Sequence, residues 1–211
     1  MHFWPHCTNV RAGKSAGGFG LVELMVSISI MMILTTIIIV RQSSFNGAVL
    51  LRSQAYEIAF TLRRAQLLAV SGNNRGVAVF ATSTQQYGVY FDTNAPNTYI
   101  LFHDLDANGQ WNSVVDAQVG APGTIDKRFA IRAISDLDGD DITRSGTGFN
   151  ISFVRPNFDA KFNDTVDPGY ETGNPAVYID IAQVNKVGDE PGTVRRVEIS
   201  KTGQISVTSF E

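Results

Sequence analysis

The sequence predicts an α+β fold, in which a long N-terminal α-helix packs on an antiparallel, β-rich globular head. Three observations support this prediction. Residues 19–40 form an almost uninterrupted apolar run. Apolar and small residues then recur at helical spacing up to Ser71, and short alternating segments separated by Gly, Asn, Asp and Pro follow from Gly72 onward. We therefore expect a helix over residues 19–71 and a head over residues 72–211.

The apolar run has the length of a transmembrane helix. A helix needs ~20 apolar residues to cross the hydrocarbon core of a membrane, and Glu23 is the only charged residue in this run. A secretory signal peptide usually has an apolar region of only about 7–15 residues, followed by a small-residue cleavage site, whereas Arg41 and Gln42 follow here. An ordinary signal anchor stays open as an alternative. Because Arg11 and Lys14 precede the run, we expect a cytoplasmic N-terminus and a head outside the cytoplasmic membrane, in the periplasm or at the cell surface.

The helix is expected to continue beyond the membrane as an amphipathic segment that buries one face against the head. Asn46-Gly47 is a predicted weak point or bend, because glycine costs about 1 kcal/mol inside a helix. Ser71-Gly72-Asn73-Asn74 predicts the end of the helix. The expected buried face alternates steps of four and three residues and consists of Leu51, Ala55, Ile58, Leu62, Ala65 and Ala69.

Eight short segments of the head have the alternation or apolar content of β-strands. Lys201-Thr202-Gly203 is the predicted turn before the last of them. The loop around Asn157–Pro175 is predicted to be mobile or a contact surface. The predicted strands are Val77–Ala81, Tyr87–Phe91, Tyr99–His103, Phe129–Ile134, Phe149–Val154, Ala176–Val184, Val194–Ser200 and Gln204–Thr208.

The start of the apolar run resembles a known processing motif. The sequence GGFGLVELMV at residues 17–26 is similar to the cleavage and methylation motif of type IV pilins and type II secretion pseudopilins, with Gly20 where the family usually has Thr. The resemblance implies that a prepilin peptidase removes residues 1–18 as a leader, cutting between Gly18 and Phe19 and methylating the new N-terminus. It also implies an inner-membrane assembly platform, contact with lipid and other pilins through the N-terminal helix, and a filament after assembly.

Glu23 allows two interpretations. A carboxylate within an apolar helix costs about 2.5–3.5 kcal/mol at the centre of a membrane and less near its surface. Glu23 either reaches the headgroups or, as the resemblance favours, pairs with the α-amino group of Phe19 on a neighbouring subunit. That pairing would set the axial register between subunits.

The head has a looser resemblance to the GspH/FimT group of minor pilins and pseudopilins. It is carried by the stretches Arg63–Gln66, Tyr87–Asp92 and Arg196–Ile205. The resemblance implies a minor subunit that acts in assembly or at the filament tip. Cys7 is the only cysteine and lies in the expected leader, so no disulfide-closed loop is expected in the processed chain.

A calcium loop is a candidate after the predicted strand Tyr99–His103. Asp104, Asp106 and Asn108 follow the D-x-D-x-[DN]-G pattern that begins such loops. Val115 occupies the twelfth position, where a closing Glu is required, and Asp116 comes one residue later. The alternative is a turn in which Asp, Asn and Gly serve local hydrogen bonds. A second acidic group lacks the motif's glycine and consists of Asp136, Asp138, Asp140 and Asp141.

DNA binding by the helix is a further candidate, because some FimT-like proteins are thought to bind DNA. Arg52 and Arg63 lie eleven residues apart and so share a helix stripe, with Arg64 beside them. A solvated or subunit-facing surface explains the same residues. Without Arg11 and Lys14 the chain holds 15 basic and 20 acidic residues, a net charge of −5, which argues against strong DNA binding.

An enzymatic function is not expected, and no cofactor other than calcium is suggested. Gly13-Lys14-Ser15 resembles the end of a phosphate-binding loop, but Thr8 stands where the first glycine is required. After residue 18 the chain has His103 as its only histidine and no cysteine, so nucleophilic catalysis has few candidate residues.

Overall fold

The computed structural model describes residues 18, 20–71, 86–142, 148–154, 157–164, 175–184 and 193–209, with the side chains of residues 40–45 and 164 excepted. The chain divides into two compact units, Met1–Ser44 and Phe45–Glu211. The second unit therefore includes the later part of the helix together with the strands. The later part of the helix and the strands share one core, as the predicted packing of the helix on the head requires.

The helix α1 comprises Leu21–Ser71. It continues through Gly47, where we had expected a weak point or bend. Gly47 has a packing role instead, because a Cβ there would lie 3.0 Å from Nε2 of Gln183. All six residues of the predicted buried face are fully buried, which confirms the amphipathic assignment of this segment.

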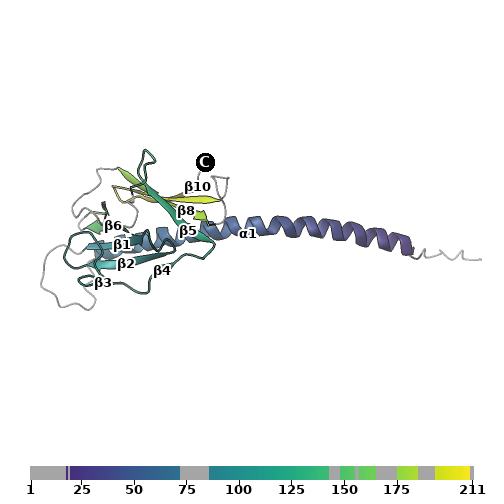
Figure 1. Cartoon of the computed structure of the whole chain (residues 1–211), viewed down its shortest axis with the longest axis horizontal. Coiled ribbons are helices and arrows are strands. Elements are labelled where there is room, and N and C mark those ends of the chain that lie inside the picture. The colour runs from purple at the N-terminus through teal and green to yellow at the C-terminus, as the bar shows by residue number, and fades with distance from the viewer. Residues whose placement is uncertain are drawn as a thin grey trace, which may run out of the picture. The chain divides into compact units, whose positions relative to one another are not determined.

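Two antiparallel sheets form the rest of the head, and Figure 1 shows them as separate layers. The larger sheet has the order β3-β2-β1-β6-β7, with β4 also paired to β2, and the smaller sheet has the order β10-β9-β8-β5. The strands of the larger sheet are β1 (Gln86–Asp92), β2 (Thr98–Asp104), β3 (Ala117–Gln118), β4 (Gly123–Thr124), β6 (Gly148–Val154) and β7 (Ala160–Asp164). Those of the smaller sheet are β5 (Phe129–Ser135), β8 (Ala176–Gln183), β9 (Val194–Ser200) and β10 (Ile205–Ser209).

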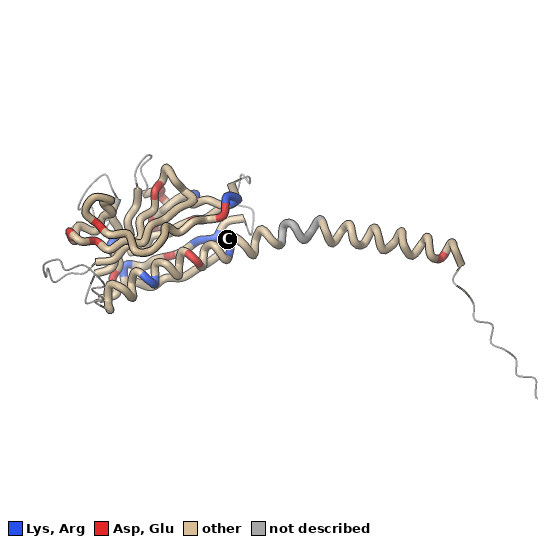
Figure 2. Tube along the Cα trace, turned by 90° about the horizontal axis from the view of Figure 1, so that it is seen from below, with Lys and Arg blue, Asp and Glu red and all other residues tan. Residues whose placement is uncertain are grey.

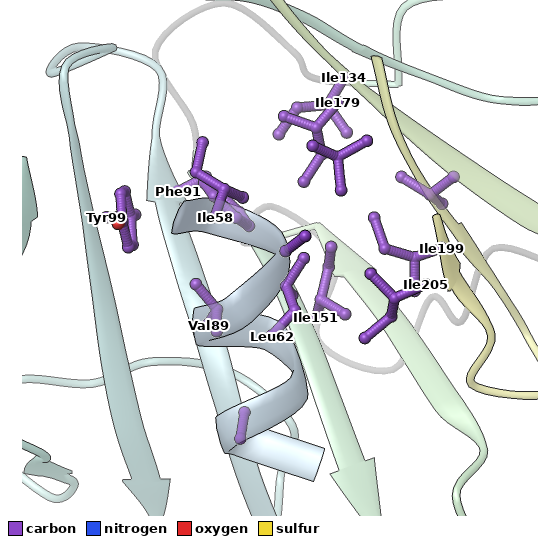
Figure 3. Close-up of a cluster of buried hydrophobic side chains, with 14 of the residues drawn as sticks. Ile58, Leu62, Val89, Phe91, Tyr99, Ile134, Ile151, Ile179, Ile199 and Ile205 are labelled. Carbon is purple, nitrogen blue, oxygen red and sulfur yellow. The ribbon is translucent and has the colours of Figure 1, made fainter. Parts of the chain in front are cut away.

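One hydrophobic core joins α1 to both sheets. Figure 3 shows Ile58 and Leu62 of α1 among Val89 of the larger sheet and Ile199 and Ile205 of the smaller one. The alternation along each strand explains this arrangement, because every second side chain points to the same face of a sheet. The α+β fold class predicted from the sequence is thus confirmed.

Seven of the eight predicted strands coincide with observed strands, and Val77–Ala81 lies outside the described residues. The prediction that Asn157–Pro175 is a loop is wrong for its first part. Ala160–Asp164 forms β7, which pairs with β6 along five residues. Ala160 and Phe162 are buried there, but a short segment with only two buried apolar residues gave little strand signal.

Candidate functional site

The N-terminal part of α1 has an apolar surface that the chain itself does not cover. Residues Leu21–Ile39 are long and apolar enough to cross a membrane, and none of this segment is buried within the chain. Its large apolar side chains are between 52% and 75% exposed. Such a surface requires lipid or other protein around it, because exposed apolar area is unfavourable in water. This segment is the first candidate functional site.

The hydroxyl groups in this segment are satisfied within the helix. Each donates a hydrogen bond to the carbonyl oxygen four residues earlier: Ser27 to Glu23, Ser29 to Met25, Thr35 to Met31 and Thr36 to Met32, at 2.7–2.8 Å. This pattern suits an environment without water, where every polar group needs an internal partner.

Glu23 is the only ionisable residue between Leu21 and Ile39. It lies in the first turn of α1, where a carboxylate is favoured by the helix dipole. Its side chain is exposed, so its charge is available to a partner outside the chain. Figure 2 shows how few charged residues this part of α1 carries compared with the head.

The predicted cleavage position lies just before this helix. Gly18 is exposed, and Phe19 lies outside the described residues. The Leu24 N–H donates to the Gly20 carbonyl at 3.1 Å, so helical hydrogen bonding starts immediately after the predicted new N-terminus. Cleavage and methylation stay predictions.

The three arginines proposed for DNA are used differently. Arg63 donates from Nη2 to the Ile205 carbonyl at 3.0 Å, which ties α1 to β10. Arg52 donates to the Tyr56 hydroxyl at 3.4 Å, and its guanidinium lies 5.5 Å from the centre of that ring. Arg64 is exposed and lies about 100° around the helix from Arg63. Arg64 therefore lies off the helix stripe that Arg52 and Arg63 share.

The acidic loop after β2 is the second candidate site. Carboxylate oxygens of Asp104, Asp106 and Asp116 lie within 4.8 Å of one another. Asp104 is the last residue of β2 and is almost completely buried, Asp116 is partly buried and Asp106 is exposed. The fold thus brings Asp116 close to the two aspartates predicted from the sequence. Asp116 lies there although it comes one residue after the twelfth position of the motif.

Backbone N–H groups hold two of these carboxylates. Asp104 accepts hydrogen bonds from the N–H groups of Ala107 and Gly109, both at 2.7 Å. Asp116 accepts from Leu105 at 3.0 Å and from Asn112 at 2.7 Å, so it closes the loop onto its own beginning. The side chain of Asn108 makes hydrogen bonds within the loop. It donates to the Asp106 carboxylate at 2.8 Å and accepts from the Gln110 N–H at 2.7 Å.

Burial raises the pKa of Asp104 to about 7, and the neighbouring Asp106 carboxyl adds to the rise, while the Gly109 N–H opposes it. Burial also raises the pKa of Asp116. The ion pairs Arg128–Asp126 and Arg196–Asp180 do not involve this loop, and no described basic side chain forms an ion pair with its three aspartates. The three carboxyl groups therefore share a small space without an ion-pair partner among the described residues.

His103 lies near enough to Asp116 for their charges to interact, but it is not one of the three clustered carboxyl residues. Its ring stacks on Tyr87 with the ring centres 4.4 Å apart, and burial lowers the pKa of its imidazole. Successive residues of a strand point to opposite faces, so His103 and Asp104 face different sides of the sheet. This placement agrees with a packing role for His103.

The second acidic group is a turn after β5. Asp136 accepts from the N–H groups of Asp138 at 3.1 Å and of Asp140 at 2.9 Å, and Gly139 has a positive φ of 85°. The Asp136 side chain thus makes the local hydrogen bonds that such turns need.

Sequence reasoning passed over two amide residues beside the Asp104–Asp116 loop. Gln86 lies directly opposite Asp104 on the neighbouring strand, and Asn163 lies on β7. Gln86 donates to the Ala107 carbonyl at 3.4 Å, and Asn163 donates to the Gly109 carbonyl at 3.2 Å. The sequence carried no signal for either residue, because only strand pairing brings them to the loop.

Comparison with known protein families identifies the N-terminal segment. A family model described as the prokaryotic N-terminal methylation motif matches residues 13–39. Comparisons with curated proteins and with solved structures found no match. The matched segment spans the predicted cleavage position, Glu23 and the whole apolar part of α1, and this motif is typical of type IV pilin-like proteins. In this chain the methylation motif therefore lies at the start of an apolar helix, and a β-rich head follows that helix.

Proposed function

We propose that the chain is a minor pilin or pseudopilin of a type II secretion system or a type IV pilus. A prepilin peptidase removes residues 1–18 and methylates Phe19, and residues 19–40 then hold the subunit in the cytoplasmic membrane until it enters a filament. The observation that carries this proposal is the methylation motif over residues 13–39, which coincides with a helix whose apolar side chains have no cover within the chain.

Glu23 supports assembly through this helix. The hydroxyl groups nearby are satisfied by their own helix, so the carboxylate is the polar group that requires a partner from outside. The α-amino group at Phe19 of an adjacent subunit supplies a matching charge, and pairing removes two charges that are costly in an apolar environment. The pair would form only at one axial offset between subunits.

A second apolar stripe lies on the head part of α1. Val49, Tyr56, Phe60 and Leu67 are between 47% and 69% exposed. Their spacings of 7, 4 and 7 residues place them along one line of the helix, about 180° from the buried face. This stripe gives a neighbouring subunit an apolar contact, and it continues the packing of α1 beyond the membrane.

The contacts of α1 with the last hairpin support a minor subunit of the GspH/FimT type. Gln66 donates to the Gly203 carbonyl at 2.9 Å, and Arg63 donates to the Ile205 carbonyl. Gly203 has a positive φ of 81°, and a Cβ there would overlap the Phe158 carbonyl oxygen. The stretches Arg63–Gln66 and Arg196–Ile205, which carry the resemblance to this group, therefore contact each other.

The test is incorporation of a Glu23→Gln variant into filaments in cells that assemble them. We expect normal cleavage at Gly18 but a recovery in the filament fraction that is lower by about tenfold or more, because the neighbour's ammonium group is left unpaired. Ser29→Ala is the matched control, since that hydroxyl is satisfied within its own helix. Normal incorporation of the cleaved Glu23→Gln variant would contradict the register role.

A binding role of the head in DNA uptake, adhesion or substrate export is the second candidate. A cavity of about 620 Å³ is lined by Arg52, Tyr56, Arg195 and residues 207–209 of β10. The Nε of Arg195 is buried without a hydrogen-bond partner among the described residues, which favours an anionic ligand. A gel shift should then be weakened by Arg52→Ala and by increasing salt, but not by Arg64→Ala. Equal effects of the two variants would argue against a site in this cavity.

A further inference from the structure

The loop between β2 and β3 concentrates negative charge without compensation. Asp104, Asp106 and Asp116 bring three carboxylates within 4.8 Å, and no described basic side chain forms an ion pair with them. Like charges at this separation repel one another, unless a proton or a cation lies between them. Acidic clusters alone are common on protein surfaces, so an independent observation is needed to identify a ligand.

The buried amide of Gln86 provides that observation. Gln86 is 5% exposed and lies opposite Asp104 in the β1–β2 ladder. Its Nε2 donates to the Ala107 carbonyl, which places the carboxamide against the loop, while its Oε1 has no hydrogen-bond partner. A buried acceptor without a partner costs about 1–3 kcal/mol. A cation among the three carboxylates would give this oxygen a partner.

Asn163 on β7 is a second buried amide that contacts this loop in the same way as Gln86. It is 4% exposed, its Nδ2 donates to the Gly109 carbonyl, and its Oδ1 has no partner. Gly109 has a positive φ of 79°, and a Cβ there would overlap Asn163 Nδ2, so the backbone must approach this amide closely. Two buried amides therefore donate to loop carbonyls and leave their oxygens unpaired.

We propose that Asp104, Asp106 and Asp116 form a calcium site with the Oε1 of Gln86 as a neutral ligand. All four supply oxygen, which Ca²⁺ prefers in sets of about six to eight, whereas zinc sites usually include nitrogen or sulfur. The imidazole of His103 is stacked on Tyr87 and faces the other side of the sheet. Magnesium requires a near-ideal octahedron and keeps several waters, so a crowded set of three carboxylates suits calcium better.

Calcium at this position would fix the loop over the outer face of the larger sheet. The Trp111 ring lies 5.6 Å from that of Phe102, and the Trp111 N–H donates to Asn150 Oδ1 at 2.9 Å. One ion would link Asp104 at the end of β2 to Asp116. Trp111 lies between these two residues in the chain, so the ion would hold the segment that makes these contacts. This proposal is independent of the assembly role, because every residue involved belongs to the head.

The experiment measures calcium binding to the full chain in detergent micelles. Calorimetric titration and thermal unfolding are compared in excess chelator and at about 10 mM calcium or magnesium, above the ~0.1–1 mM dissociation constants of extracellular sites. We expect calcium, but not magnesium at the same concentration, to raise Tm by several degrees. No calcium-dependent shift, or the same shift with magnesium, would overturn the proposal.

Variants identify the site. Asp106→Asn affects an exposed side chain and should weaken calcium binding about tenfold or more, whereas Asp138→Asn in the turn after β5 should leave it unchanged. Gln86→Met removes the neutral oxygen without changing charge and should also weaken binding, which a merely electrostatic attraction would not show. Unchanged affinity of Asp106→Asn, or an equal loss in Asp138→Asn, would refute the site at this loop.

Discussion

Two adjacent arginines on α1 differ in what they contact. The guanidinium of Arg63 reaches the backbone of β10, while Arg64 is exposed and forms no hydrogen bond or ion pair to any described residue. A charged donor to a carbonyl contributes about 1.5–3 kcal/mol where it is shielded, and less where water competes. The contact therefore gives Arg63 a structural role that its position on a basic helix stripe did not indicate.

Substitution of the two arginines separates structure from charge. Arg63→Ala should lower the free energy of unfolding by about 1–2 kcal/mol, because the Ile205 carbonyl loses a charged donor. Arg64→Ala should change it by less than about 0.5 kcal/mol, as is usual for exposed positions. Thermal unfolding of the two variants measures the difference. Equal stabilities would show that the Arg63 contact contributes nothing in solution.

Asp104 makes the stability of the metal-free head depend on pH. Its pKa is about 7 in the folded chain, above its ordinary value, so the folded state binds this proton more tightly than the unfolded state does. The stabilising contribution is present below the ordinary pKa of an aspartate and is lost as pH rises through about 7. In chelator, the Tm of the parent protein relative to Asp104→Asn should therefore fall as pH rises from about 4 to 7. A difference that is constant over this range would contradict the raised pKa.

At the level of elements, α1 has two faces with opposite roles in the head. The face with Leu62 is fully buried in the core shared by both sheets, while Leu67 on the opposite face is 64% exposed. Both are leucines in the same helix, so intrinsic helix propensity is the same at the two positions. Their different burial alone should decide what each contributes to folding.

The same substitution at both positions tests this. Leu62→Ala should destabilise the chain by about 2–5 kcal/mol through lost burial and a cavity, and Leu67→Ala by less than about 0.5 kcal/mol. Chemical denaturation of the full chain in detergent gives both values. If Leu67→Ala were equally destabilising in the isolated subunit, the exposed stripe would belong to the core instead of a subunit contact.

Periodicity in the sequence predicted most of the fold. The six buried residues from Leu51 to Ala69 follow helical spacing, and the long strands alternate or are strongly apolar, so both patterns were readable. The two-residue strands β3 and β4 were not predictable, because they exist only through pairing with β2. Strand β7 was missed because its pairing with β6 stabilises a short and polar sequence.

The candidate sites were predictable to different degrees. Glu23 and the Gly18–Phe19 position depend on a contiguous motif, which the sequence displays directly. Asp104 and Asp106 were also readable, and Asn108, predicted with them, makes side-chain hydrogen bonds within the turn. Loop closure brings Asp116 into the cluster and strand pairing places Gln86 opposite Asp104, and no local spacing encodes either.

Across the whole molecule, the two compact units satisfy their apolar residues in opposite ways. The head buries them in a core of its own, whereas residues 21–39 leave theirs exposed. An exposed apolar helix of this length requires apolar surroundings, and we propose that lipid supplies them before assembly and other helices supply them in a filament. The methylation motif at the start of that helix is typical of type IV pilin-like proteins.

The most direct test of this account is the intact mass of the protein recovered from membranes of cells that contain an active prepilin peptidase. We predict a chain that begins at Phe19 and carries one additional methyl group. Gly18→Val should block the conversion, while Gly20→Ala, beyond the cleavage position, should not. A chain that still begins at Met1 beside an active peptidase would contradict processing and leave residues 19–40 as an ordinary membrane anchor.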